Sequence, residues 1–227
     1  HVAALCDEDA DSAALSDSKK LDVYVRDRQT GLNRLVSMPP DGVSESAAEP
    51  FAFAPDGSWV LFYTGGAAHY YDTDAYSHTT YTIIAHLDEE PIAFEPVMVG
   101  NADFGGMPRG ASADGRTVVF ADGGWTNPGY VENVGLTPSG NSIDNGYILD
   151  VDAGVATLVT AADDGTPGVV PYYVDGETTM VDFVEIAVSG DGKRTVFSTI
   201  QYGLVDTSEI TLPCPDTPHL VYLRDCP

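Results

Sequence analysis

Positive charge is scarce in this sequence of 227 residues. It contains 10 Lys and Arg against 35 Asp and Glu, which gives a formal net charge of -25 at pH 7. A polyanion repels nucleic acid and anionic lipid, so we expect neither as a main partner. The acidity itself has three interpretations: a solvated surface that keeps the protein soluble, a salty or otherwise harsh external habitat, or cation binding.

Long apolar runs are also missing. No stretch approaches the ~20 apolar residues that a membrane-spanning helix needs, so no membrane span is predicted. The sequence begins with His1 rather than Met, which favours a mature or trimmed product and a secreted, cell-surface or periplasmic location. With 43% hydrophobic residues the chain can bury a core, and its 12 Tyr and 8 Phe suit β-strands.

Cysteine is confined to the two ends of the chain, at Cys6, Cys214 and Cys226. No CxxC pair is present, which argues against a zinc site or a thioredoxin-type motif. In an oxidising compartment, a disulfide from Cys6 to Cys214 or Cys226 would tie the termini together and leave one odd cysteine. Closing so long a loop contributes up to ~4–5 kcal/mol in the chain-entropy treatment. The alternative is three free thiols.

Catalytic motifs are lacking as well. The sequence contains no GxSxG elbow, no HExxH, no P-loop and no GxGxxG after a strand. The five His residues show no metal-ligand spacing. We therefore predict no catalytic residues, no bound cofactor and no enzymatic activity.

Strand patterns dominate what is present. The run FAFAPDGSWVLFY, residues 51–63, is apolar, stops at Asp56-Gly57 and restarts at once as another apolar run. The same arrangement surrounds Asp114-Gly115 and Asp191-Gly192. Asp-Gly between two alternating runs predicts a β-hairpin, because Gly accepts a positive φ at little cost and Asp tolerates it. Three hairpins are therefore expected.

A second element recurs between these hairpins. It is an alternating strand that closes on Asp, a short turn and another strand, at 21–37, 68–85 and 146–161, and its first strand returns at 219–227. The closing residues are Asp27, Asp74, Asp152 and Asp225. A hairpin followed by this element makes a four-stranded antiparallel meander. One such sheet cannot bury both faces, so radial stacking into a β-propeller is predicted.

These motifs carry a family resemblance. S-x-DG-(R/K)-x-V-x-F occurs at 112–120 and, with Thr195 at the Val position, at 189–197. APDGSWVLF at 54–62 is a near match, and D-V-Y-V-R-D-R-x-T-G occurs at 22–31. The pairing resembles the TolB-type β-propeller repeat over most of residues 21–225. The resemblance implies an all-β propeller of about four four-stranded antiparallel blades, the first and last incomplete. No catalytic residues carry over, because the shared motif is structural.

The expected organisation is a single TolB-like domain over residues 1–227. Its parts are an N-terminal acidic segment at 1–20, a partial blade at 21–38, blades at 50–86 and 108–161, and a partial blade at 184–227. Unpaired strand edges recruit partners, and complementary open ends can continue into a filament. We therefore predict a structural or protein-binding role, with protein partners or self-association through open blade edges.

Two other functions stay open at this point. One is a carbohydrate-active or other hydrolytic propeller that uses carboxylates on its rim. The other is a calcium-stabilised adhesion module. Asp7, Asp9 and Asp11 alternate as the oxygen ligands of a calcium loop do, but the central Gly and the closing Glu are missing. A solvated acidic loop is the alternative interpretation of these three residues.

Overall fold

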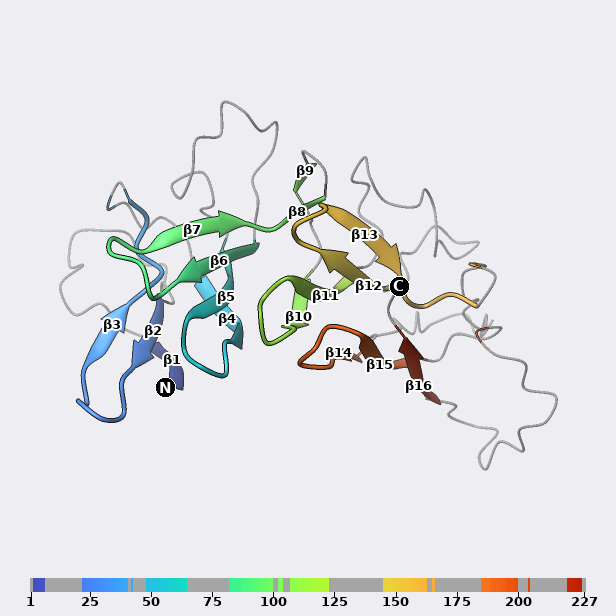
Figure 1. Cartoon of the computed structure of the whole chain (residues 1–227), viewed down its shortest axis with the longest axis horizontal. Coiled ribbons are helices and arrows are strands. Elements are labelled where there is room, and N and C mark those ends of the chain that lie inside the picture. Colours follow the sequence, from blue (N-terminus) through green and yellow to red (C-terminus); the bar gives the residue numbers. More distant parts are fainter. Residues whose placement is uncertain are drawn as a thin grey trace, which may run out of the picture. The chain divides into compact units, whose positions relative to one another are not determined.

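The computed structural model describes the strands and turns of the chain. The described residues are 2–6 (backbone only), 22–40, 42, 48–64, 82–99, 102–103, 107–122, 145–162, 165, 185–199, 204 and 220–225. Within these ranges every regular element is a β-strand (Figure 1). The chain divides into two compact units, His1–Phe104 and Gly105–Pro227. Each unit is described by itself.

The first unit contains two antiparallel meander sheets and a short two-stranded ribbon. The strands of its first sheet are β1 (Val2–Cys6), β2 (Asp22–Arg26) and β3 (Asn33–Leu35). Those of its second sheet are β4 (Ala48–Phe53), β5 (Trp59–Thr64), β6 (Thr82–His86) and β7 (Ala93–Pro96). The ribbon pairs β8 (Met98–Val99) with β9 (Ala102–Asp103).

The second unit repeats this architecture. Its first sheet is formed by β10 (Met107–Ala111), β11 (Thr117–Asp122), β12 (Asn145–Asp150) and β13 (Val155–Leu158). Its second sheet is formed by β14 (Glu185–Val188), β15 (Arg194–Thr199) and β16 (Leu220–Asp225). In all four larger sheets, strands that follow one another in these sequences are hydrogen-bonded neighbours. The predicted fold class is confirmed: all-β sheets of three, four, four and three strands, shaped like propeller blades.

One strand pair differs from the prediction. The third and fourth strands of the second sheet, β6 and β7, lie at 82–86 and 93–96, not within 68–85. The expected closing residue, Asp74, falls outside the described residues. The physical reason is that the run from Thr82 to Ala85 is apolar or β-branched and fully buried, whereas YYDTDAY contains two aspartates, which favour turns.

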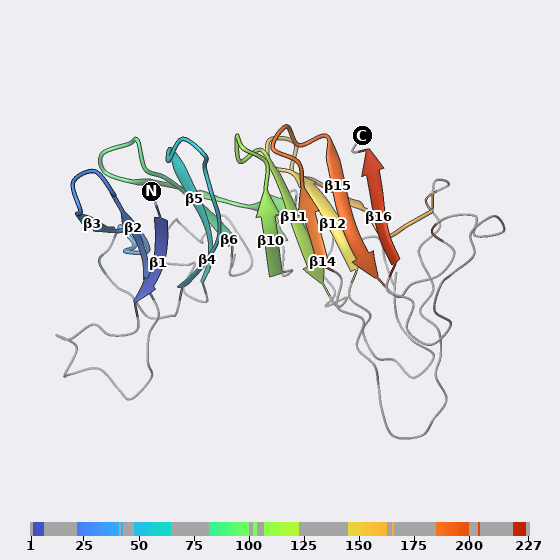
Figure 2. The same ribbon diagram turned by 90° about the horizontal axis from the view of Figure 1, so that it is seen from below.

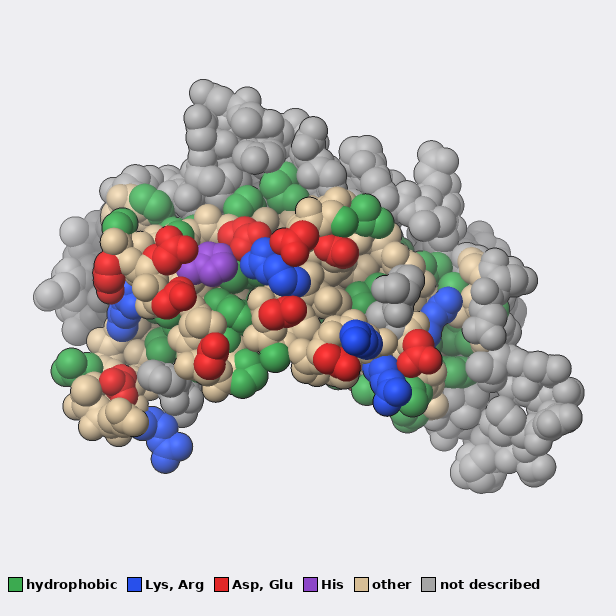
Figure 3. Space-filling model, viewed as in Figure 1, with side chains coloured by type: hydrophobic (Ala, Val, Ile, Leu, Met, Phe, Trp, Pro, Cys, Tyr) green, Lys and Arg blue, Asp and Glu red, His purple; other side chains and the backbone are tan. Residues whose placement is uncertain are grey.

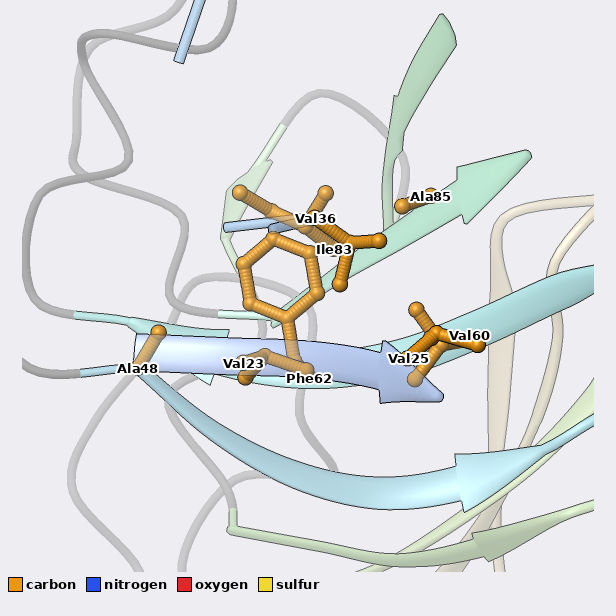
Figure 4. Close-up of a cluster of buried hydrophobic side chains, with 8 residues drawn as sticks. All are labelled: Val23, Val25, Val36, Ala48, Val60, Phe62, Ile83 and Ala85. Atoms are coloured by element: carbon orange, nitrogen blue, oxygen red, sulfur yellow. The ribbon is translucent and has the colours of Figure 1, made fainter. Parts of the chain in front are cut away.

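In the first unit, the two sheets enclose a hydrophobic core between them. Val23, Val25 and Val36 of the first sheet pack with side chains of β4, β5 and β6 (Figure 4). Phe62 lies in the middle of this cluster and is fully buried. Alternation along β2 points Val23 and Val25 to the core and therefore turns Tyr24 and Arg26 to the opposite side of the sheet.

The second unit has an equivalent core. Val119 and Ile148 of the β10–β13 sheet pack against Ile186 and Phe197 of the β14–β16 sheet, with Tyr222 of β16 at the border of the cluster. Figure 2 shows β14 beside β10 and β11, with β15 and β16 following outward from it. Within each unit, a buried face of one sheet therefore covers a face of the next.

A buried polar pair marks equivalent positions in the two units. Ser37 Oγ donates to Asp22 Oδ1 at 3.0 Å and accepts from the Val23 amide. In the second unit, Thr160 Oγ1 donates to Asn145 Oδ1 at 3.0 Å and accepts from the backbone amide of the next residue along β12. The next-to-last strand of each of these sheets is thus tied to the chain that follows its last strand in the same way.

Candidate functional site

The three Asp-Gly motifs lie in turns that are closed by their own hydrogen bonds. Asp56, Asp114 and Asp191 follow β4, β10 and β14, and the glycines after them have φ of 85°, 72° and 73°. Each carboxylate accepts a hydrogen bond from a serine hydroxyl, at 2.7, 2.5 and 2.6 Å. Each also accepts one from the backbone amide two residues further on, at 2.9, 3.0 and 3.1 Å. These aspartates therefore close their turns.

The same hydrogen bonds set the acidity of these carboxyl groups. Donation from the Ser112 hydroxyl and then from the Arg116 amide lowers the pKa of Asp114 below its usual value. The pKa of Asp191 is lowered by the Ser189 hydroxyl and then by a backbone amide. That of Asp56 is lowered in the same way. A general acid needs a raised pKa near the working pH, so these turns lack the property that such a role requires.

The turns of the second unit also contact one another. The Ala113 amide donates to the Gly190 carbonyl oxygen at 2.8 Å, which joins the turn after β10 to the turn after β14. Gly192 lies so close to β11 that a Cβ atom added to it would be 2.6 Å from Thr117 Oγ1. These glycines therefore serve the packing of one sheet against the next as well as the turn itself.

The other sequence-based candidates fall largely outside the described residues. Asp7, Asp9, Asp11, Cys214 and Cys226 are among the residues that are not described, and of Cys6 only the backbone in β1 is described. In the described ranges, no group of three or more His, Cys, Asp or Glu side chains could hold a metal ion. Among the same residues, no helix combines the length and the apolar character that a bilayer crossing requires. The calcium site and the disulfide stay predictions.

Among the described residues, one face of the β14–β16 sheet exposes several large apolar side chains. On this face Ala187, Val196 and Leu223 form one cross-strand row, and Glu185, Ser198 and Val221 form the next. We call these six residues the outer face. Val221 is 73% exposed, Leu223 72% and Val196 41%. Three adjacent branched apolar side chains on one sheet are typical of a surface that another protein element covers.

A repeated motif shows how unusual this exposure is. Val-Tyr-Val-Arg-Asp starts at Val23 in β2, and Val-Tyr-Leu-Arg-Asp starts at Val221 in β16. In β2 the two aliphatic residues, Val23 and Val25, are 0% and 7% exposed. Their counterparts in β16, Val221 and Leu223, are the exposed residues of the outer face. The same motif therefore buries its aliphatic side in one sheet and exposes that side in the other.

The Tyr and Arg side chains of the motif lie on the opposite side of each strand from the aliphatic residues. Tyr222 stacks on Phe197 with ring centroids 5.1 Å apart, and burial raises the pKa of its phenol. Arg224 donates from one guanidinium nitrogen to the carbonyl oxygens of Val159 and Ala161, at 2.9 and 2.6 Å. In β2, by contrast, Arg26 is exposed and donates to Asn33 of the neighbouring strand at 3.2 Å. In β16 the Tyr-Arg side thus contacts the adjacent sheet through both residues.

A comparison of Val196 with Val119, both in the second unit, shows the same difference in burial. Val119 of β11 and Val196 of β15 both stand five residues after the aspartate of their Asp-Gly turn. Val119 is fully buried under the β14–β16 sheet, whereas Val196 is on the outer face. The predictions from the sequence concerned strand edges and acidic clusters and did not include this face. The repeated Val-Tyr-x-Arg-Asp motif was the available signal.

Acidic side chains are spread over the visible surface of both units, with Lys and Arg among them (Figure 3). The outer face has charges of both signs at its border: Arg194 and Asp225 form an ion pair of 3.3 Å next to Leu223, and both side chains are well exposed. An exposed pair of this kind stabilises the fold little. The outer face is therefore an apolar patch with a polar rim, which is the composition typical of a protein-binding surface.

Comparisons with known proteins identify no family for this chain. No protein-family model matches the sequence, and no curated protein matches it. Among solved structures, a protein described as "putative TolB" from Agrobacterium tumefaciens is 15% identical, with a TM-score of 0.43. The match covers 91% of this chain and 53% of that one, so the chain spans about half the length of that protein.

Proposed function

We propose that this protein is a non-catalytic, protein-binding scaffold of propeller type, and that its outer face receives another β-sheet. The observation that supports this most is the exposure of Val221 and Leu223, because their counterparts Val23 and Val25 are buried under a neighbouring sheet. Burying a fully exposed side chain of this kind is worth ~1.5–3 kcal/mol, so covering them contributes favourably to binding, against the entropy that association costs.

The Asp-Gly turns and the described carboxylates support a scaffold rather than an enzyme. The turn aspartates hold hydrogen-bonded positions in their own loops. The sheets are built to stack, since each unit buries its core between two of them. We also propose a location outside the cytoplasm, which would agree with one of the three interpretations of the net charge, a salty or harsh external habitat; localisation of a tagged chain would test this.

A site-specific photocrosslinker tests the binding role directly. Benzoylphenylalanine placed at Leu223, in the cells that produce the protein, is expected to form adducts of defined mass. Leu32 is the matched control, because it is also a leucine, is 70% exposed and lies in the turn between β2 and β3. Adducts from position 223 alone support a docking surface. Equal yields at the two positions, or none at 223, would refute it.

A further inference from the structure

Two surfaces of this chain have complementary characters. The outer face of the β14–β16 sheet presents the aliphatic side of the Val-Tyr-x-Arg-Asp motif. The β1–β3 sheet presents the Tyr-Arg side of the same motif, because Val23 and Val25 point into the core and Tyr24 and Arg26 to the opposite side. We call the side with Tyr24, Arg26 and Leu35 the tyrosine face. Tyr24 and Leu35 are half-buried cross-strand neighbours on it, and Arg26 is exposed.

The second unit shows what a Tyr-Arg side does when a sheet lies against it. Tyr222 borders the cluster that Ile148 and Val119 of the adjacent sheet help to form, and Arg224 caps two carbonyl oxygens there. The aliphatic side of one sheet is thus the natural counterpart of the Tyr-Arg side of the next. In this chain the outer face offers the first kind of surface, and the tyrosine face offers the second.

We propose that a second copy of this chain covers the outer face, with its tyrosine face as the contacting surface. This inference rests on the proposed function and identifies the partner. The interface is heterologous, because each copy contributes a different surface. A heterologous contact leaves one free surface of each kind at the two ends of a pair, so it continues into larger rings or filaments.

Individual charges on the two faces favour this pairing, whereas the net charge of each copy opposes it. Arg26 is exposed on the tyrosine face and Glu185 is exposed on the outer face, while Asp225 at the border is already paired with Arg194, so a contact between Arg26 and Glu185 would favour one orientation. The net charge of -25 on each copy repels at low ionic strength. In about 1 M salt the screening length is only ~3 Å, so association is expected to strengthen as salt is raised.

Sedimentation velocity of the purified chain in about 1 M NaCl tests the proposal. The unchanged chain is expected to form dimers and larger species as its concentration rises. Leu223→Asp, which puts a charge on the outer face, and Arg26→Glu, which reverses the charge of the tyrosine face, are each expected to reduce association at least tenfold. Leu32→Asp adds the same charge at an equally exposed leucine and is expected to associate like the unchanged chain.

Mixing the two variants gives the sharpest result. Leu223→Asp retains an intact tyrosine face and Arg26→Glu retains an intact outer face, so an equimolar mixture is expected to form heterodimers and nothing larger. Circular dichroism and melting curves establish that both variants are folded. If Arg26→Glu disturbs the sheet, Leu35→Asp on the same face replaces it. Failure of the mixture to dimerise, or a strictly monomeric unchanged chain, would overturn the proposal.

Failure of this inference is distinguishable from failure of the proposed function. If Leu223 crosslinks to a different polypeptide while the chain sediments as a monomer, the outer face is a docking surface and the second copy is the wrong partner. If Leu223→Asp abolishes self-association and Arg26→Glu leaves it unchanged, the tyrosine face is not the counterpart. If no crosslink forms at position 223, the proposed function fails as well.

Discussion

Replacing Gly192 by Ala tests whether the close approach of the turn after β14 to β11 contributes to the packing of the two sheets. Two costs are expected. Gly192 has a φ of 73°, and an L-residue in this region costs ~1–2 kcal/mol, partly offset by a less flexible unfolded chain. The new Cβ would also lie 2.6 Å from Thr117 Oγ1 and 3.3 Å from Thr117 Cβ. Thr is stiff at χ1, so relieving this overlap costs a further ~1–3 kcal/mol.

A matched control separates these two costs. Gly165 has a φ of 83°, and a Cβ added there meets nothing within 4 Å. Gly165→Ala is therefore expected to lose about 1 kcal/mol, from the backbone alone. Gly192→Ala is expected to lose about 2–4 kcal/mol. With an m-value of about 2–3 kcal/mol/M, this is a shift of roughly 1 M in the urea midpoint.

A double-mutant cycle identifies the source of the difference. If Thr117 causes it, Gly192→Ala combined with Thr117→Ala regains about 1–3 kcal/mol relative to the sum of the two single changes. Equilibrium unfolding in urea, followed by tryptophan fluorescence and circular dichroism, measures all four proteins. Equal losses for Gly192→Ala and Gly165→Ala would refute the idea that contact between the turns holds the sheets together.

Three further predictions concern the same unit. The lowered pKa of Asp114 stabilises the fold at neutral pH, and this contribution is lost as the pH falls from the unfolded pKa of ~3.9 through the lowered folded pKa. The urea midpoint of Asp114→Asn should therefore fall less steeply on acidification than that of the unchanged chain; an equally steep fall contradicts this. Arg224→Met keeps the aliphatic stem but removes two charged hydrogen bonds, so about 2–3 kcal/mol should be lost in urea unfolding; no loss would contradict the observed contacts. Thr160→Val removes its bond to buried Asn145 and should lower the melting stability by about 1–3 kcal/mol, whereas an unchanged melt would argue against that pair.

The turns were readable from the sequence because their cause is local. Asp114 and Gly115 bring the side-chain acceptor and the permissive backbone to one turn, and the Ser at position 112 completes it. The regular spacing of such turns predicts meander sheets without knowledge of tertiary contacts. The third strand of the second sheet, β6, was misplaced because aspartate at a strand end was used as the marker. Its run of buried residues extends from Thr82 to Ala85, and the strand ends at His86 instead.

The outer face could not be predicted in the same way. Val221 and Leu223 have the alternation of an ordinary strand, and the pattern of β16 closely matches that of β2. Whether the aliphatic side is covered depends on the sheet that lies beside it, which is a tertiary property. Local sequence therefore determines that these residues form a strand with one aliphatic side, and only the arrangement of sheets shows that this side is left uncovered in β16.

Hydrogen exchange at two protein concentrations tests the docking of a sheet on the outer face most directly. In high salt, raising the concentration is predicted to slow amide exchange in residues 194–199 and 220–225, which carry the outer face, and in 22–26, which carry the tyrosine face. Residues 155–158, in β13, serve as the internal reference and are predicted to exchange at the same rate throughout. Exchange in 220–225 that is unaffected by concentration, in a chain that sediments as a monomer and forms no crosslink at Leu223, would contradict the account.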